Sequence, residues 1–264
     1  MSRGTCLTVT AAGARTPVSK NIADGVHLVS ASFVNCYLLE DERGLTLVDT
    51  GLPAMWGQLM DAVTELGFSP GDISAVVLTH AHFDHTGCAA RAQQELSLPI
   101  WAHAEDHYVA AHPYRYRRQR PAIFYPLRYP RAIPILGSMA KAGAFKVRGV
   151  RGVQPLTPDS VLDVPGRPRI VFTPGHTAGH CALHLADRRT VLTGDALVTL
   201  DPYTGFTGPQ IVARAATADT AQALASLDAL AATGAQVVLP GHGEPWRTGI
   251  QAAVDHAKTH HTTE

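Results

Sequence analysis

The residues with the clearest chemical potential are histidines and aspartates that directly follow apolar, strand-like runs. The first run leads into the hexapeptide His80-Ala81-His82-Phe83-Asp84-His85, and two later runs each lead into Pro-Gly-His. Imidazole and carboxylate side chains without thiolates suit Zn²⁺, Fe or Mn²⁺. The pattern therefore predicts a transition-metal site built at strand ends. Its candidate ligands are His80, His82, Asp84, His85, His176, Asp195 and His242.

The spacing of these ligands favours two ions. His80 and His82 are two residues apart, so both point the same way in an extended segment. Asp84 and His85 follow a turn of the chain and can face a second point nearby. Seven groups are too many for one tetrahedral ion, but they suit two ions roughly 3.5–4 Å apart that share a carboxylate. Glycines at 175, 194 and 241 allow the tight turns that present the ligands.

Alternating strands and helices must position these side chains. Apolar and β-branched runs predict strands at Val26–Ser30, Val34–Leu39, Leu45–Val48, Ile73–Leu78, Pro99–Ala102, Val161–Val164, Ile170–Thr173, Ala182–Leu185, Thr190–Thr193 and Ala235–Leu239. Helical periodicity predicts helices over 52–66, after His85, from about Glu105, over 217–232 and over 246–258. This order indicates an α/β (α+β) architecture with sheets inside and helices outside. We expect one domain over residues 1–264.

A basic, proline-rich and aromatic segment at about 107–152 interrupts this alternation. Ten basic residues and no acidic ones lie between Asp106 and Asp159, and five prolines fall between 113 and 134. These prolines exclude a long regular element, although we expect a helix near 135–144. One interpretation is a solvated lid or a subunit contact in a homodimer. The other is a substrate cap that attracts an anionic group through Arg115, Arg117, Arg118 and Arg120.

Taken together, the motifs resemble those of the metallo-β-lactamase superfamily, and Leu47-Val48-Asp49-Thr50-Gly51 resembles its early aspartate motif. The resemblance implies an αββα four-layer sandwich with a two-metal site at one edge. It places His80, His82 and His176 on one metal, Asp84, His85 and His242 on the other, and Asp195 as the bridge. It also implies that Asp49 supports the site from behind.

Further details of the resemblance bear on the substrate. Residues 173–180 look most like the glyoxalase-II-like hydrolase branch, and His180 is predicted to orient the site from behind the ligands. The superfamily's quorum-quenching lactonases carry a tyrosine three residues after the bridging aspartate. Val198 takes that position here, and the nearest tyrosine, Tyr203, is the candidate substrate contact.

The expected reaction is hydrolysis of an ester, thioester, lactone or amide. Two Zn²⁺ ions, with Fe or Mn as alternatives, would activate a bridging hydroxide that attacks the carbonyl. Asp84 would act both as a ligand and in proton transfer. Two alternatives stay open. One is a mononuclear iron sulfur (persulfide) dioxygenase of the same superfamily that uses His80, His176 and Asp195, and the other is a non-catalytic protein that binds anions or nucleic acid.

Composition narrows the class of protein. The 264 residues are 45% hydrophobic, with 22 basic and 22 acidic side chains. This balance argues against a nucleic-acid coat protein, and no apolar run reaches the roughly 18 residues that span a bilayer. The N-terminus lacks a clear leader, and four widely spaced cysteines indicate reduced thiols. We therefore expect a cytoplasmic enzyme with a small-molecule substrate and neither a nucleic-acid nor a membrane partner.

Overall fold

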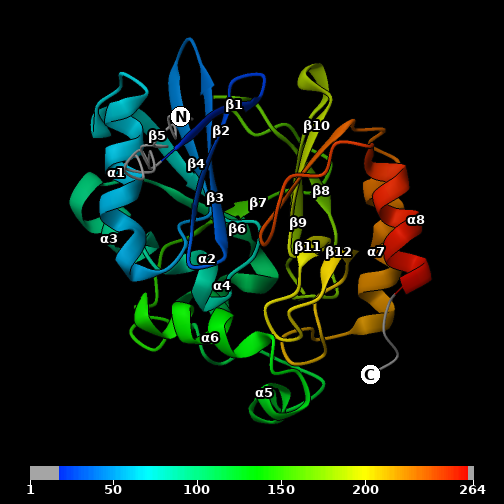
Figure 1. The fold of residues 1–264 in the computed structure, drawn as a ribbon. Helices are drawn as coiled ribbons and strands as arrows, with labels where there is room; N and C mark the ends of the chain where they lie inside the picture. The colour runs from blue at the N-terminus through cyan, green and yellow to red at the C-terminus, as the bar shows by residue number, and fades with distance from the viewer. Residues whose placement is uncertain (1–17, 261–264) are drawn as a thin grey trace, which may run out of the picture.

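Two β-sheets stack face to face in the computed structural model, which describes residues 18–260 (Figure 1). The larger sheet has the strand order β1 to β7, and the smaller has the order β13-β10-β9-β8. The strands of the larger sheet are β1 (Ser19–Ala23), β2 (Val26–Ala31), β3 (Val34–Asp41), β4 (Gly44–Val48), β5 (Ile73–Val77), β6 (Ile100–His103) and β7 (Gln154–Leu156). Those of the smaller sheet are β8 (Arg169–Phe172), β9 (Cys181–Leu185), β10 (Thr190–Gly194) and β13 (Val237–Pro240).

Helices cover the outer face of each sheet. α1 (Trp56–Glu65) and α3 (Ala89–Leu96) pack on the larger sheet, and α7 (Thr220–Ala231) and α8 (Ile250–His260) pack on the smaller one. The period of two in β9 shows how both faces are buried, because Leu183 points between the sheets and Ala182 points toward the helices. The predicted αββα sandwich is confirmed.

Strand direction brings the ligand loops together. β4, β5, β6 and β7 are parallel neighbours, and β10 is parallel to β13. β8 and β10 also run in the same direction, since each is antiparallel to β9. The carboxyl ends of β5, β8, β10 and β13 therefore supply loops to one edge of the sandwich, where sites of α/β proteins are usually built.

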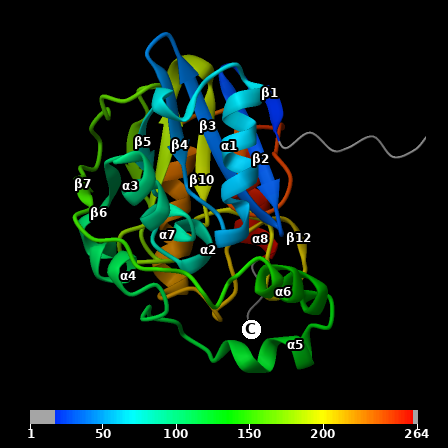
Figure 2. The ribbon, with the colours of Figure 1, turned by 90° about the vertical axis from the view of Figure 1, so that its left-hand side faces the viewer.

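The segment predicted as an irregular insertion crosses this same edge (Figures 1 and 2). It contains α4 (His107–Ala111), a 3-10 turn over Ala122–Phe124, α5 (Tyr125–Arg128) and α6 (Ala132–Lys141). α6 begins earlier than expected, because Pro134 is its third residue and a proline is tolerated in the first turn of a helix.

Some elements differ from the prediction. Residues 161–164 are not a strand, since only Val161 makes a single bridge, to Arg169. The predicted helix from Glu105 is a 3-10 turn followed by the short α4. The sequence does not predict β1, β7, β11 (Val198–Leu200) or β12 (Thr207–Gln210). β1, β7 and β12 are short and largely polar, and β11 has only three residues, too few to show a period.

Two other expectations concern cysteines and membranes. Cys36, Cys88 and Cys181 are buried free thiols, in agreement with the expectation of reduced cysteines. The N-terminal residues, where we expected no leader, and Cys6 lie outside the described residues. Over residues 18–260, no helix has the length and apolar character needed to cross a bilayer.

Candidate metal centre

The predicted ligands converge at the edge where the two sheets meet. His80 follows β5, and His82 precedes the short helix α2 (Phe83–Thr86), which carries Asp84 and His85. Across the gap between the sheets, His176 follows β8, Asp195 follows β10 and His242 follows β13. All seven side chains are buried, and they form three overlapping groups whose ligand atoms lie within 4.8 Å of one another. The groups are His80/His82/His176, His80/His85/Asp195 and Asp84/His85/His242.

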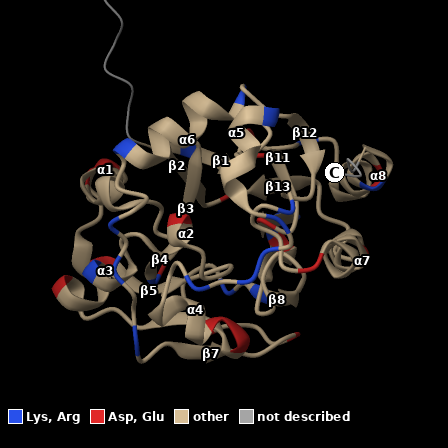
Figure 3. Cartoon of the chain, turned by 90° about the horizontal axis from the view of Figure 1, so that it is seen from below, with Lys and Arg blue, Asp and Glu red and all other residues tan. Residues whose placement is uncertain are grey.

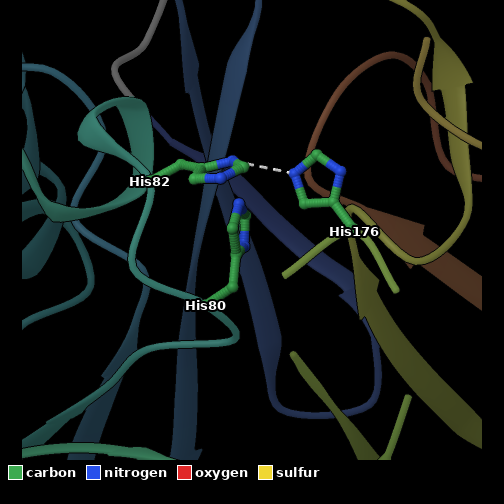
Figure 4. A group of neighbouring side chains, drawn as sticks. All are labelled: His80, His82 and His176. Atoms are coloured by element: carbon green, nitrogen blue, oxygen red, sulfur yellow. Dashed lines mark hydrogen bonds between the residues drawn. The ribbon is translucent and has the colours of Figure 1, made fainter. Parts of the chain in front are cut away.

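The first group joins the two sheets directly. His80 and His82 come from the larger sheet and His176 from the smaller one, and all three rings face a common point (Figure 4). Nδ1 of His82 lies 2.9 Å from Nε2 of His176. Residues nearly a hundred positions apart in the chain thus present their ring nitrogens to one small volume.

Asp195 lies between this group and the other ligands. Its Oδ2 lies 3.4 Å from Nε2 of His176 and 3.3 Å from Nε2 of His242, and its Oδ1 lies 3.5 Å from Nε2 of His85. Oδ2 of Asp84 approaches Nε2 of His242 at 3.4 Å. One carboxylate therefore contacts histidines of both proposed ligand sets.

Unpaired buried atoms show that the donor set fits metal ions. Nε2 of His80, Nε2 of His82 and Oδ1 of Asp195 have no hydrogen-bond partner among the described residues. Buried polar atoms are rarely left unsatisfied. Imidazole and carboxylate donors are ligands that divalent transition metals accept. The cluster has the chemistry of a metal centre.

The two sides of the cluster differ electrostatically. Burial, reinforced by the neighbouring imidazoles, holds the pKa values of His80 and His176 well below their ordinary range. Burial also lowers the pKa of His82 to about 4. Burial opposes the charged form of His85 too, but Asp195 and Asp49 outweigh it and raise its pKa to about 9. Neutral imidazole, the form that binds metal, is thus favoured around His80.

Asp49 contacts His85 on the ring nitrogen that faces away from Asp195. Its Oδ2 lies 2.9 Å from Nδ1 of His85 and accepts a hydrogen bond from Oγ1 of Thr79 at 2.8 Å. Its Oδ1 accepts a hydrogen bond from the backbone N–H of Thr79 at 2.8 Å. The backbone of Asp49 is left-handed, with φ of 56°. These contacts direct Nε2 of His85 toward Asp195.

His180 supports the backbone of Asp195 rather than a ligand side chain. Its Nε2 accepts hydrogen bonds from the N–H groups of Asp195 and Ala196 at 3.0 and 3.1 Å, so the proton of the neutral ring lies on Nδ1 and faces Oγ1 of Thr173. Gly194 makes this approach possible. A Cβ there would lie 2.9 Å from Nε2 of His180, and the residue has φ of +49°.

Sequence reasoning missed Asp106, which joins two ligand loops. Its carboxylate accepts hydrogen bonds from the N–H of Ala81, the N–H of Gly179 and Oγ1 of Thr177, at 2.8–2.9 Å. Asp106 is buried. No spacing or motif marks this residue, because its partners are distant in sequence.

A second residue missed from sequence, Tyr116, covers the cluster. The centroid of its ring lies 4.1 Å from that of His82, and its hydroxyl hydrogen bonds with Tyr203. Asp84 is close enough to both phenols to raise their pKa values, although burial is the larger cause. Tyr203 therefore lies near the predicted ligands, and its partner comes from the basic segment.

The four predicted arginines lie in three different surroundings. Arg115 and Arg117 line a cavity of about 460 Å³ that also contacts His82 and Tyr116. The guanidinium of Arg118 lies 5.3 Å from the centroid of the Tyr116 ring. Arg120 is exposed and does not line this cavity. The cavity wall also carries the carboxylates of Glu105, Asp106 and Asp219, so its charge is mixed.

Comparison with known proteins gives a consistent result. The model of the metallo-beta-lactamase superfamily matches residues 29–242. The chain is 27% identical to the probable metallo-hydrolase YflN of Bacillus subtilis over 84% of this chain and 85% of that protein. It is 27% identical to an N-acyl homoserine lactonase of Bacillus thuringiensis over 63% and 62% of the two chains. A metallo-beta-lactamase family protein of Thermus thermophilus superimposes with a TM-score of 0.66 at 28% identity, covering 90% of this chain and 79% of that one.

Proposed function

The chain belongs to the metallo-β-lactamase superfamily, and from this premise we propose that it is a hydrolase of carbonyl compounds that works with two divalent metal ions. The observation that carries the proposal is Asp195, whose carboxylate contacts His176, His242 and His85 at 3.3–3.5 Å. A carboxylate in this position suits a shared ligand better than a ligand of one ion. The esters, thioesters, lactones and amides are the substrate classes that the proposal covers.

The ligands divide into two sets around Asp195. His80, His82 and His176 would hold one ion, and Asp84, His85 and His242 the other. When bound, such ions supply Lewis acidity, which lowers the pKa of water and polarises a carbonyl oxygen. Because Asp84, His85 and His242 form a second buried group of ligand atoms, the structure supports a site for two ions better than the single-iron alternative.

The chain's own residues would orient the substrate and move the proton. The Asp84 carboxylate lies beside both His242 and the tyrosine pair, so it can accept a proton from the attacking water and pass it to a leaving group. One phenol of the Tyr116–Tyr203 pair donates its proton to the other, so the pair has one hydroxyl proton left to donate to a substrate oxygen. The ring of Tyr116 over His82 keeps bulk water away from this side of the site.

The cavity next to His82 is our candidate for the part of the substrate that extends from the scissile bond. Its volume of about 460 Å³ suits a small molecule. Arg115 and Arg117 on its wall would attract a carboxylate or phosphate group on that substrate. The N-acyl homoserine lactonase relatives make lactones one class to examine, although Val198 lies where those enzymes carry a tyrosine.

The test is a panel of esters, thioesters, N-acyl homoserine lactones and β-lactams assayed with protein loaded separately with Zn²⁺, Mn²⁺ or Fe²⁺. We expect hydrolysis of at least one class, lost on treatment with a chelator and restored by the metal. The metal content of the same samples is measured in parallel. A protein that holds two ions per chain and hydrolyses no carbonyl compound would contradict the proposed activity while leaving the metal centre intact.

A further inference from the structure

The segment between the basic loop and α6 presents large apolar side chains to solvent. We call residues 121–134 the α5 projection; it contains the 3-10 turn over Ala122–Phe124, α5 and the start of α6. Leu127 is 84% exposed, Ile123 75%, Phe124 63% and Ile133 54%. Both ribbon views show α5 at the lower extreme of the molecule, clear of the two sheets (Figures 1 and 2).

These side chains face solvent because the inner face of the projection packs against the rest of the protein. Tyr125 is buried and its ring contacts those of Tyr129 and Tyr203, and on α6 the buried residues are Ala132, Ile135 and Met139. Ile123 and Leu127 are four residues apart, so they lie on the same side of the turn, opposite Tyr125. The outer apolar face therefore has no packing role among the described residues. Exposed apolar clusters of this kind mark interaction sites.

Both charged residues of the α5 projection are positive. Arg128 and Arg131 are exposed beside the apolar residues, and no acidic residue occurs between Asp106 and Asp159. Figure 3 shows lysine and arginine on α5 and along the adjoining loop at this edge of the molecule. A two-fold symmetric contact between copies of the chain through this face would bring the arginines of both copies into one interface. Like charges in such a contact repel, so charge complementarity favours an anionic partner over a second copy.

We propose that the α5 projection docks on an anionic lipid bilayer. A convex projection cannot enclose a small ligand, but it can insert side chains such as Leu127 and Phe124 at the boundary between headgroups and acyl chains. Arg128 and Arg131 would then lie at the level of the anionic headgroups. We expected no membrane partner because no apolar run is long enough to span a bilayer. A contact at the bilayer surface requires no spanning segment. The docked edge is also the edge at which α2 lies, the helix that carries Asp84 and His85 (Figure 1).

The experiment is co-flotation of the full-length protein with phosphatidylcholine vesicles, with and without about one-third phosphatidylglycerol. We expect binding to the anionic vesicles that is at least about tenfold stronger than to neutral ones and that weakens as salt rises. The pair Arg128→Gln and Arg131→Gln should weaken it by about thirtyfold. The pair Ile123→Gln and Leu127→Gln should abolish it, and a Leu127→Trp variant should show blue-shifted emission only with anionic vesicles.

A matched control lies elsewhere in the same basic segment. Phe145 is 80% exposed but lies beyond α6, outside the projection. Phe145→Gln should bind vesicles as the parent does, and thermal unfolding should show that every variant is folded. Equal binding to neutral and anionic vesicles overturns the proposal. So does a stable dimer that dissociates in the Ile123→Gln, Leu127→Gln variant without any vesicle binding. Neither result depends on hydrolysis, so failure here is distinct from failure of the proposed function.

Discussion

The ring of Tyr116 lies against the ring of His82, with 4.1 Å between their centroids. One residue belongs to the basic segment and the other to the predicted ligand set. The contact means that the segment closes over the candidate metal centre instead of projecting entirely into solvent. It therefore supports the interpretation of the segment as a cap, and it makes the chemistry of Tyr116 testable.

We predict that Tyr116→Phe lowers kcat about tenfold with little change in KM, which corresponds to one hydrogen bond of about 1.4 kcal/mol. The variant keeps the ring over His82 but loses the hydroxyl that hydrogen bonds with Tyr203. Tyr116→Leu should raise KM as well, since the ring is lost. Tyr108→Phe is the control, because Tyr108 lines the same cavity without covering the ligands. Unchanged kinetics in Tyr116→Phe would show that the hydroxyl only supports the cap.

We predict that replacing Arg115 and Arg117 together by Gln lowers kcat/KM for an anionic substrate about fivefold and spares its neutral analogue. Raising salt should reproduce the effect in the parent, because screening shortens the reach of surface charges. The control replaces Arg148 and Arg151, which lie in the same basic segment but do not line the cavity. If the Arg115/Arg117 variant and the Arg148/Arg151 control show the same ratio of kcat/KM for the anionic and neutral substrates, the cavity arginines do not recognise charge.

We predict close to two divalent ions per chain in the parent protein and less than one in Asp195→Ala. Removal of the carboxylate takes a ligand atom from both sides of the cluster at once. Elemental analysis of protein prepared without chelator gives the number, and hydrolysis should fall with it. His184→Ala is the matched control, a strand histidine outside all three ligand groups. A single iron in the parent would instead favour the dioxygenase alternative.

We predict that Asp106→Ala lowers the free energy of unfolding by about 3 kcal/mol. The substitution removes the acceptor of three hydrogen bonds and leaves the N–H groups of Ala81 and Gly179 without it. Urea unfolding of the metal-free protein isolates this effect from metal binding. Glu105→Ala, at the exposed neighbouring position, should change the stability by less than about 0.5 kcal/mol. Equal stabilities of the two variants would contradict the role of Asp106 as a link between the ligand loops.

The sequence alone determined the order of the main strands and helices and the identity of the candidate ligands. Both follow from local signals: apolar runs of strand length, and histidine or aspartate directly after them beside glycine. His80 and His82 could be paired from their spacing, because side chains two apart in an extended segment share a side. The sandwich itself could be expected from the family motifs, since these span most of the chain.

Only the tertiary structure decided which side chains surround the ligands. Asp106 and Tyr116 contact the site through partners far away in sequence, and no local pattern encodes such contacts. The basic segment illustrates the same limit. Its composition showed an unusual charge, but only packing could bury Tyr125, turn Leu127 outward and place Arg115 and Arg117 on the wall of a cavity. Side-chain direction in an irregular segment depends on what it packs against, and that is set by the whole fold.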